Sequence, residues 1–359
     1  MKKIALLTGG GDCPGLNSVI RSVVQTASKY HLNIVGIPDG FKGLLENKFV
    51  PLDLNETTGI FSKGGTILGT SNIDTPFKVP TLRGGKKIYE DRSEEAMSHL
   101  TKEGISALLV VGGDGTQRIA HEFALKGVNV IGIPKTIDND LNGTEMTIGF
   151  LTAVSTAVEA LDRLHTTAES HHRILVVEVM GRNAGWIALF AGLSGDADAI
   201  LIPEIPFDLN KVASSLNDLY HTKKKYSIVV VAEGAKPVGG DVTVRKILEY
   251  SPDKIRLGGI SHLVADQLEA LTGREARAIV LGHLLRGGSP VAFDRVLASR
   301  FGMSAVKALV DSQFDTMVAY KRDNVELVPL DTGAGKNRYV QMDSSFLIAA
   351  RERGILFGD

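Results

Sequence analysis

Two acidic side chains in one short segment could divide the work of a proton transfer. Residues 134–140 read PKTIDND, where an apolar run ends and Asp138 and Asp140 follow a lysine, Lys135. One carboxylate can accept a hydroxyl proton while the other orients a metal ion or the backbone. Taken alone, the tripeptide at 138–140 equally predicts a turn held by Asx hydrogen bonds. The neighbouring motifs therefore decide whether this segment is only a turn or also a catalytic pair.

Glycine clusters follow two other apolar runs, at residues 9–15 (GGGDCPG) and 112–116 (GGDGT). Each cluster leads into a segment of helical periodicity, so free backbone amides and the positive end of a helix favour a bound phosphate there. Neither cluster is a P-loop or a complete GxGxxG motif, and a tight turn would also account for the glycines. Asp114, between two glycines, is suited to Mg²⁺; alternatively it caps the following helix.

Basic residues are the third group in the sequence that could take part in chemistry. A third glycine cluster, GHLLRGGSP at 282–290, carries His283 and Arg286, which suit a phosphate or sugar hydroxyls. Three more arginines lie at expected strand beginnings or ends: Arg173, Arg182 and Arg277. Because a guanidinium group pairs bidentately with phosphate, this group predicts a ligand with more than one phosphate. Together with a base and Mg²⁺, these residues predict phosphoryl transfer to a phosphorylated substrate that carries a hydroxyl group.

Such residues need a scaffold of parallel strands. Short runs rich in Val, Ile and Leu alternate with helix-periodic segments, which is the rhythm of an α/β fold. Buried parallel strands are predicted at 4–8, 33–37, 107–111, 128–133, 173–179, 199–202, 227–232 and 277–281. Helices are predicted at 16–30, 94–103, 116–126, 147–168, 184–193, 208–223, 256–272 and 293–311. The tail, 312–359, lacks this rhythm and is expected to pack across the first domain.

Composition restricts the class of protein. A length of 359 residues predicts two domains or one large one. The 40 Lys and Arg residues balance 41 Asp and Glu, so there is no electrostatic footprint for nucleic acid or for a membrane surface. One cysteine, Cys13, excludes a disulfide framework within the chain, and no apolar run reaches the roughly 18 residues of a membrane span. We therefore expect a cytoplasmic protein.

Six motifs in order resemble the 6-phosphofructokinase family: GGGDCPGLN, GGDGT, PKTIDND, EVMGR, VAEG and GHLLRGGSP. The resemblance covers the chain from Lys3 to about Gly302. It implies two doubly wound, mainly parallel α/β domains with the active site in the cleft between them. The larger, nucleotide- and Mg-binding domain would comprise 1–150 and 305–359, and the smaller, sugar-phosphate-binding domain 151–304. The implied reaction is phosphorylation of the 1-hydroxyl of fructose 6-phosphate in glycolysis.

The resemblance also implies a role for individual residues. Asp138 would be the base, supported by Thr136, Lys135 and Asp140, while Arg182 would stabilise the transferring charge. Asp114 would be the Mg²⁺ ligand. The donor site would contain Gly11, Asn72, Gly113, Gly115 and Thr116. The sugar-phosphate site would contain Thr136, Asp138, Met180, Gly181, Arg182, Glu233, His283 and Arg286. Arg173 and Arg277 would reach in from a neighbouring subunit, which implies a homodimer or homotetramer with active sites completed across subunits.

The choice of phosphoryl donor rests on two positions. In the family, a glycine at the position of Gly115 admits ATP, whereas an aspartate there marks pyrophosphate enzymes. Lys135 is otherwise typical of pyrophosphate enzymes, so pyrophosphate is the alternative donor. The combination is similar to the bacterial mixed-substrate group, and ATP is the expected donor.

Other readings stay open beside this one. Asn72 stands where bacterial ATP enzymes of the family carry an arginine, which leaves a non-catalytic, sugar-phosphate-sensing subunit as an alternative. Lipid and NAD kinases share only the GGDGT strand end. Arg21 matches the family's allosteric nucleotide site, but Gln25 and His165 replace two of its arginines, which argues against control by ADP or phosphoenolpyruvate.

Overall fold

The computed structural model describes residues 2–71, 75–83, 86–222, 224–247 and 255–359. Contacts between these residues divide the chain into two compact units. Unit 1 comprises Met1–Ile137, Leu141–Leu151 and Arg286–Asn337, and unit 2 comprises Asp138–Asp140, Thr152–Leu285 and Arg338–Asp359. Both units are of the α/β type, which confirms the predicted fold class. Among the described helices, none combines the length and the apolar character that crossing a membrane requires.

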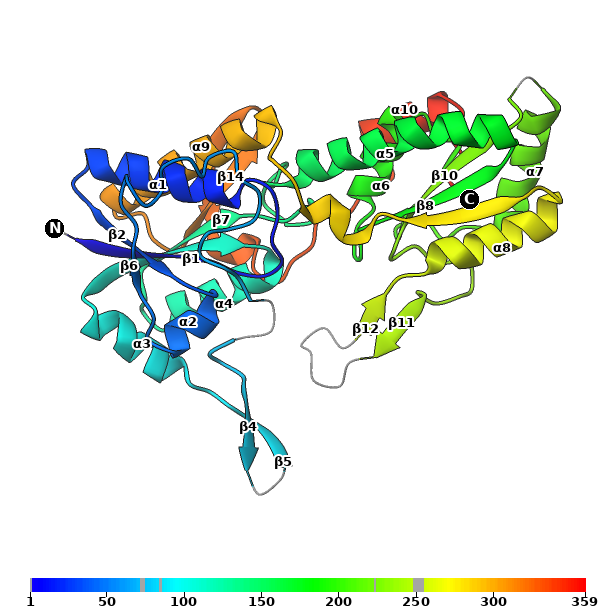
Figure 1. Cartoon of the computed structure of the whole chain (residues 1–359). Coiled ribbons are helices and arrows are strands. Elements are labelled where there is room, and N and C mark those ends of the chain that lie inside the picture. The colour runs from blue at the N-terminus through cyan, green and yellow to red at the C-terminus, as the bar shows by residue number, and fades with distance from the viewer. Residues whose placement is uncertain (1, 72–74, 84–85, 223, 248–254) are drawn as a thin grey trace. The chain divides into compact units, whose positions relative to one another are not determined.

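Within the described residues, unit 1 holds a seven-stranded sheet in the order β15-β14-β7-β6-β1-β2-β3 (Figure 1). Its strands are β1 (Lys3–Thr8), β2 (Asn33–Ile37), β3 (Val50–Pro51), β6 (Ile105–Gly112), β7 (Val130–Pro134), β14 (Thr316–Lys321) and β15 (Asn324–Pro329). Neighbouring strands are parallel except at the two edges, where β3 and β15 are antiparallel to their partners. The carboxyl ends of β1, β6 and β7 therefore lie together at the end of the sheet where its parallel strands finish.

Helices cover both faces of this sheet. They are α1 (Leu16–Lys29), α2 (Phe41–Leu45), α3 (Ser93–Lys102), α4 (Asp114–Leu125) and α9 (Ala292–Val310). Helices α1 and α9 lie on one face, and α2, α3 and α4 lie on the other (Figure 1). Ala5 and Leu7 of β1 pack toward α2–α4, while Leu6 between them is equally buried. Burial on both faces explains why the strands are continuously apolar in sequence.

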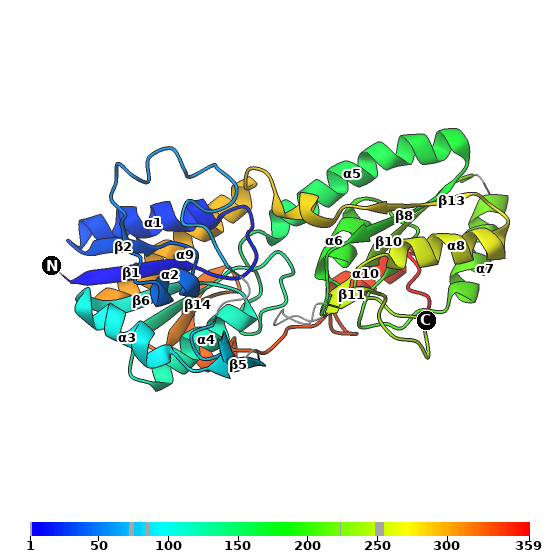
Figure 2. The ribbon, with the colours of Figure 1, turned by 60° about the horizontal axis from the view of Figure 1, so that its bottom comes forward.

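As far as the chain is described, unit 2 holds a four-stranded parallel sheet in the order β13-β8-β10-β9. These strands are β8 (Ile174–Val179), β9 (Ala199–Leu201), β10 (Ser227–Ala232) and β13 (Ala276–Val280). The helices are α5 (Phe150–His171), α6 (Trp186–Ser194), α7 (Leu209–His221), α8 (Ile260–Thr272) and α10 (Ser345–Glu352). Helices α7 and α8 share the apolar core of one sheet face, and α5 and α6 lie on the other face (Figure 2).

Shorter elements complete the two units. The 3-10 helices η1 (Gly282–Arg286) and η2 (Leu330–Thr332) follow β13 and β15, respectively. Two antiparallel hairpins, β4 (Val79–Arg83) with β5 (Lys86–Glu90) and β11 (Val244–Ile247) with β12 (Ile255–Leu257), were not predicted.

The tail follows the expectation only in part. β14 pairs in parallel with β7, so residues 316–321 join the sheet of unit 1. The last part, Arg338–Asp359, belongs to unit 2 instead of the first domain. There α10 packs on α6, and the amide of Ile200 donates to the carbonyl of Leu356 at 2.8 Å. Unit 1 also takes in Arg286–Asn337, which begins earlier than the expected boundary at residue 305.

Candidate functional site

The glycine loops that follow β1 and β6 pack around one side chain, Thr116. A Cβ atom added to Gly9 would lie 2.8 Å from Cγ2 of Thr116, and one added to Gly112 would lie 2.3 Å from its Cβ. The amide of Gly9 donates to the carbonyl of Val111 at 2.9 Å, which ties the two loops together. Packing therefore accounts for these two glycines, and it leaves bare backbone at the strand ends.

Lys135 joins the same loops to the end of β7. Its side chain is buried, and Nζ donates to the carbonyl oxygens of Gly9, at 2.9 Å, and Gly11. Its own amide donates to the carbonyl of Gly112 at 3.1 Å. The ammonium group thus brings a positive charge beneath the glycine loop of β1, where an anion would benefit from it.

Arg286 reaches the same loop from η1. Its Nη1 donates to the carbonyl of Asp12 at 3.2 Å, and a Cβ added to Gly11 would lie 2.1 Å from that nitrogen. The sequence assigned Gly11 to the donor site and Arg286 to the sugar-phosphate site. Their direct contact in unit 1 was not predicted.

The start of α4 holds Asp114 and Gly115. Gly113 is the N-cap and Asp114 is the first helical residue, so the alternative in which Asp114 caps the helix is wrong. Asp114 is half-buried. A Cβ added to Gly115 would meet no atom of the described residues within 4 Å. Packing thus gives no reason for glycine at position 115, in contrast to Gly9 and Gly112.

The carboxylate of Asp114 fits a Mg²⁺ ion that binds together with a phosphate ligand. Among the residues that the structure describes, no group of three or more His, Cys, Asp or Glu side chains could hold a metal ion. Mg²⁺ commonly takes one or two carboxylates from the protein and completes its octahedron with phosphate oxygens and water. Asp114, at the positive end of α4, supplies such a carboxylate.

The segment 138–140 lies at a turn: residues 137–138 form it, and Asn139, which follows, is left-handed at φ 51°. Asn139 and Asp140 are buried, whereas Asp138 is half-buried. Oδ2 of Asp140 accepts from Nδ2 of Asn183 at 3.4 Å. In unit 1, the half-buried Thr136 accepts at its carbonyl from Oγ1 of Thr147 at 2.6 Å. Of the two acids, Asp138 is therefore the less buried.

Four predicted residues gather at the carboxyl ends of the neighbouring strands β8 and β10: Met180, Gly181, Arg182 and Glu233. Gly181 has φ 142°, which L side chains rarely adopt, and a Cβ there would lie 2.8 Å from the carbonyl of Ala184. The amide of Glu233 donates to the carbonyl of Val179 at 3.0 Å. His283 is exposed in η1, just after β13, the other neighbour of β8. Because the strands are parallel, these residues lie at the same end of the sheet of unit 2, where its strands finish.

Arg173 and Arg277 lie at the opposite end of that sheet, where its strands begin. Arg173 precedes β8, and Arg277 is in register with Leu175 near the start of β13. Six residues of β8 span about 20 Å at the usual rise of a strand. Both arginines bind Glu275, whose pKa is lowered chiefly by the hydrogen bond from Arg173, with N to O 2.7 Å. Within one chain, these arginines do not join Met180 and its neighbours.

Gln117 was missed by sequence reasoning. It is fully buried, and its Nε2 donates to the carbonyls of Gly112, at 3.0 Å, and Ile133, at 3.1 Å. It therefore links the ends of β6 and β7 directly below Asp114 and Lys135. The available signal was an uncharged polar residue on the apolar face of a helix that begins at a glycine cluster.

Cys13, inside the first glycine cluster, is not a nucleophile in this fold. Burial raises the pKa of its thiol to about 12, and Sγ donates to the carbonyl of Ile148 at 3.4 Å. The thiolate, which is the reactive form, is therefore almost absent at neutral pH.

The hydrogen bonds of Arg21 and His165 lie away from the strand-end groups described above. Asn72 lies outside the described residues. Nη1 of Arg21 donates to the carbonyl of Leu54 at 2.6 Å, and His165 contacts the carbonyl of Gly195 through Nε2 at 2.7 Å. The expectation for allosteric control stays a prediction.

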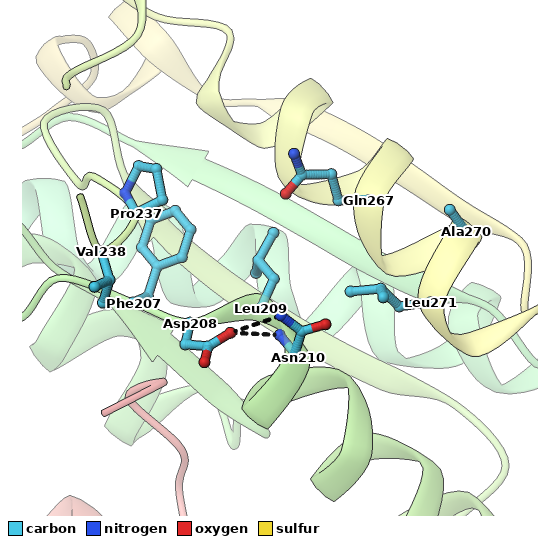
Figure 3. Close-up of a pocket in the computed structure, with 9 residues that line it drawn as sticks. All are labelled: Phe207, Asp208, Leu209, Asn210, Pro237, Val238, Gln267, Ala270 and Leu271. Carbon is cyan, nitrogen blue, oxygen red and sulfur yellow. Dashed lines mark hydrogen bonds between the residues drawn. The ribbon is translucent and has the colours of Figure 1, made fainter. Parts of the chain in front are cut away.

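A pocket of about 570 Å³ lies elsewhere in unit 2, beside the start of α7 (Figure 3). Its lining residues are Phe207, Asp208, Leu209, Asn210, Pro237, Val238, Gln267, Ala270 and Leu271. Asp208 is occupied in capping α7, because its Oδ1 accepts from the amide of Asn210 at 2.9 Å. The walls are mainly apolar and do not suit a phosphorylated ligand.

Comparison with known proteins extends these observations. The family model described as Phosphofructokinase matches residues 3–309. ATP-dependent 6-phosphofructokinase 2 of Clostridium perfringens is 50% identical, over 100% of this chain and 99% of that protein. The pyrophosphate--fructose 6-phosphate 1-phosphotransferase of Amycolatopsis mediterranei is 46% identical, over 95% of this chain and 97% of that protein.

Solved structures agree in fold. Phosphofructokinase of Pichia pastoris in the T-state matches 92% of this chain with a TM-score of 0.80 and 31% identity. This chain spans only 35% of that longer chain. The pyrophosphate-dependent phosphofructokinase of Marinobacter aquaeolei, 21% identical, shares the fold with a TM-score of 0.79 over 100% of this chain and 93% of that one. With the ordered motifs, the matching family model and full-length relatives in agreement, the chain belongs to the phosphofructokinase family.

Proposed function

We propose that this chain is an ATP-dependent 6-phosphofructokinase, which transfers a phosphoryl group from ATP to the 1-hydroxyl of fructose 6-phosphate and yields fructose 1,6-bisphosphate in glycolysis. The observation that carries the proposal is the group of glycine loops at the ends of β1 and β6, with Asp114 beside a glycine that packing does not require. The full-length similarity to proteins named for this activity supports the same reaction.

The donor phosphates would be bound by backbone amides at the two loops and by the side chain of Thr116. The residues in this role are Gly11, Gly113, Gly115 and Thr116. Mg²⁺ would be held by Asp114 and would supply charge neutralisation of the donor phosphates. Lys135 adds a buried positive charge under the same loop. Gly115 leaves open space at the start of α4, which a donor longer than pyrophosphate would occupy.

Asp138 would accept the proton of the attacking sugar hydroxyl. Asp138 is half-buried and lies at a turn, so its carboxylate could reach a substrate while Asp140 is held by Asn183. Arg182 would stabilise the charge that develops on the transferring group, and Thr136 would help to orient the acceptor. The sugar phosphate would be bound by Met180, Gly181, Glu233, His283 and Arg286.

The position of Arg173 and Arg277 supports sites shared between subunits. Both lie at the strand beginnings of unit 2, about 20 Å from the strand ends that carry Met180. If they bind the sugar phosphate, they must do so in a neighbouring copy. The active enzyme would then be a homodimer or homotetramer.

Pyrophosphate is the second candidate donor. Lys135 favours it, and a relative that is 46% identical is named for pyrophosphate. A coupled assay with fructose 6-phosphate, Mg²⁺ and either donor separates these possibilities. Turnover with ATP supports the proposal, turnover with pyrophosphate alone replaces the donor, and turnover with neither rejects the enzyme in favour of a sugar-phosphate-sensing subunit.

A further inference from the structure

The tail of the chain holds the turn that carries Asp138. The amide of Arg338 donates to the carbonyl of Asp140 at 2.6 Å. Nη2 of the same residue donates to the carbonyl of Asn139 at 3.0 Å. Asn139 is buried in a left-handed conformation, so its carbonyl points away from the usual partners of an extended strand. One residue thus binds two consecutive carbonyls of the turn.

Arg338 is itself fixed from two sides. Its guanidinium group lies over the ring of Trp186, 4.1 Å from the centroid, and Nε1 of Trp186 donates to its carbonyl at 3.0 Å. Two residues further along, the amide of Val340 donates to the carboxylate of the half-buried Glu204 at 2.9 Å. The same carboxylate accepts from the amide of Gly185 at 3.0 Å. The segment 338–340 is therefore anchored to the start of α6.

The start of α6 also ends the loop that contains Arg182. Asn183, the next residue, donates through Nδ2 to Oδ2 of Asp140 at 3.4 Å. Arg338 and Asn183 therefore approach the turn 138–140 from two different segments, and both segments converge on the start of α6. This arrangement sets the position of Asp138 relative to Arg182.

We propose that Arg338 is a positioning residue, which fixes Asp138 for proton transfer without touching the substrate. The inference rests on the proposed function, because it concerns the proposed base of that reaction. An arginine is suited to this task since its planar group can stack on Trp186 with one face and donate from its edge to Asn139. A lysine presents a compact ammonium group and cannot do both at once.

The test compares Arg338→Ala and Arg338→Lys with Arg353→Ala. Arg353 is a matched control, because it lies on the same tail and donates to the carbonyl of Leu193 at 2.6 Å, yet contacts no part of the turn among its described bonds. Each variant is made in the wild type and in the Asp138→Asn background. The coupled assay gives kcat and the KM for fructose 6-phosphate, and a thermal melt verifies folding.

In the wild-type background, we expect Arg338→Ala to lower kcat by about 10- to 100-fold, since a displacement of about 1 Å can cost 10²-fold. The KM for fructose 6-phosphate and the activity of Arg353→Ala should stay within about twofold of wild type. In the Asp138→Asn background, Arg338→Ala should cost less than about threefold, because residues that act as a unit are non-additive. Arg338→Lys should fold, and its kcat should fall by nearly as much as that of Arg338→Ala.

The positioning role is overturned if Arg338→Ala lowers kcat by the same factor in both backgrounds. It is also overturned if Arg338→Ala lowers kcat by no more than Arg353→Ala does. If Arg338→Ala does not fold, the Arg338→Lys comparison decides by the same criterion. Absence of turnover in the wild type with either donor would instead reject the proposed function, so the two failures are distinguishable.

Discussion

The guanidinium group of Arg286 occupies the space that a side chain at Gly11 would need, with Nη1 only 2.1 Å from the position of an added Cβ. A methyl group there must therefore displace the end of a flexible side chain. This relationship connects the glycine loop of β1 to a residue that follows β13, far away in the sequence.

Gly11→Ala should raise the KM for fructose 6-phosphate by about tenfold, because a displaced Arg286 would lose its proposed charge-assisted hydrogen bond to the sugar phosphate, worth about 1.5–3 kcal/mol. Stability should change little, since only the tip of Arg286 moves. The experiment is a comparison of kinetics and urea unfolding, with Gly112→Ala as the contrast. That change strikes the rigid Cβ of Thr116 and should cost about 1–3 kcal/mol. In an Arg286→Ala background, any further effect of Gly11→Ala on KM would contradict the explanation.

Gly115→Asp should weaken the use of ATP selectively. The added side chain projects from the first turn of α4 into space that the protein leaves open, so folding should be unaffected. A carboxylate beside a donor phosphate costs several kcal/mol, which predicts a loss of about 10²-fold or more in kcat/KM for ATP. The uncharged Gly115→Ala serves as the control for size. Unchanged ATP kinetics would show that another residue selects the donor.

Asp138→Asn should lower kcat by about 10²- to 10⁴-fold, with a KM for fructose 6-phosphate close to that of the wild type. The amide keeps the shape of the side chain but cannot accept the hydroxyl proton. Steady-state kinetics across a range of sugar concentrations would measure both parameters. A wild-type kcat would remove Asp138 from the role of base.

Sites shared between subunits predict complementation. Asp138→Asn and Arg277→Ala should each be nearly inactive as pure oligomers. If Arg277 serves a neighbouring copy, mixed oligomers recover some intact sites, and a 1:1 random dimer should regain roughly a quarter of the wild-type activity. The measurement follows activity after the two variants are unfolded and refolded together. Mixtures that stay inactive would place Arg277 in the site of its own chain or outside any site.

Cys13 should resist thiol reagents in the folded protein. Burial raises its pKa from 9.0 to about 12, so the folded thiol stays protonated at pH 8 and the reactive thiolate is scarce. Above pH 9, the unfolded thiol ionises while the folded one does not, so this group lowers stability as pH rises from about 9 to 12. Labelling at pH 8 should be slow in buffer and rapid in denaturant. Rapid labelling of the native protein would show that the loop opens.

The sequence predicted most strands and helices of both sheets because buried parallel strands are continuously apolar. The run ALLVV at 107–111 is one example, and it lies inside β6. β14 was missed because its partner β7 lies about 180 positions earlier, and no local pattern reports such pairing. The hairpins were missed because their strands are short and largely polar, as in β4 and β5.

The candidate site divides in the same manner. Asp114 was singled out by the glycine cluster around it, and Gly181 by the resemblance of the motif EVMGR to the family. Residues that support them from a distance were not, because Gln117 and Arg338 act through contacts between segments that lie apart in the sequence. Packing against Thr116 requires a glycine at position 9, whereas no packing contact requires one at position 115. The sequence alone cannot distinguish these two glycines.

Both units are discontinuous in the chain, and this has a consequence for synthesis on the ribosome. β14 enters the sheet of unit 1 from residues 316–321, and the segment Arg338–Asp359 completes unit 2. Domains generally fold as units, with the N-terminal one first. Here, the emerging chain cannot complete either unit in turn, so both must wait, with exposed sheet edges, until the last fifth of the 359 residues has left the exit tunnel.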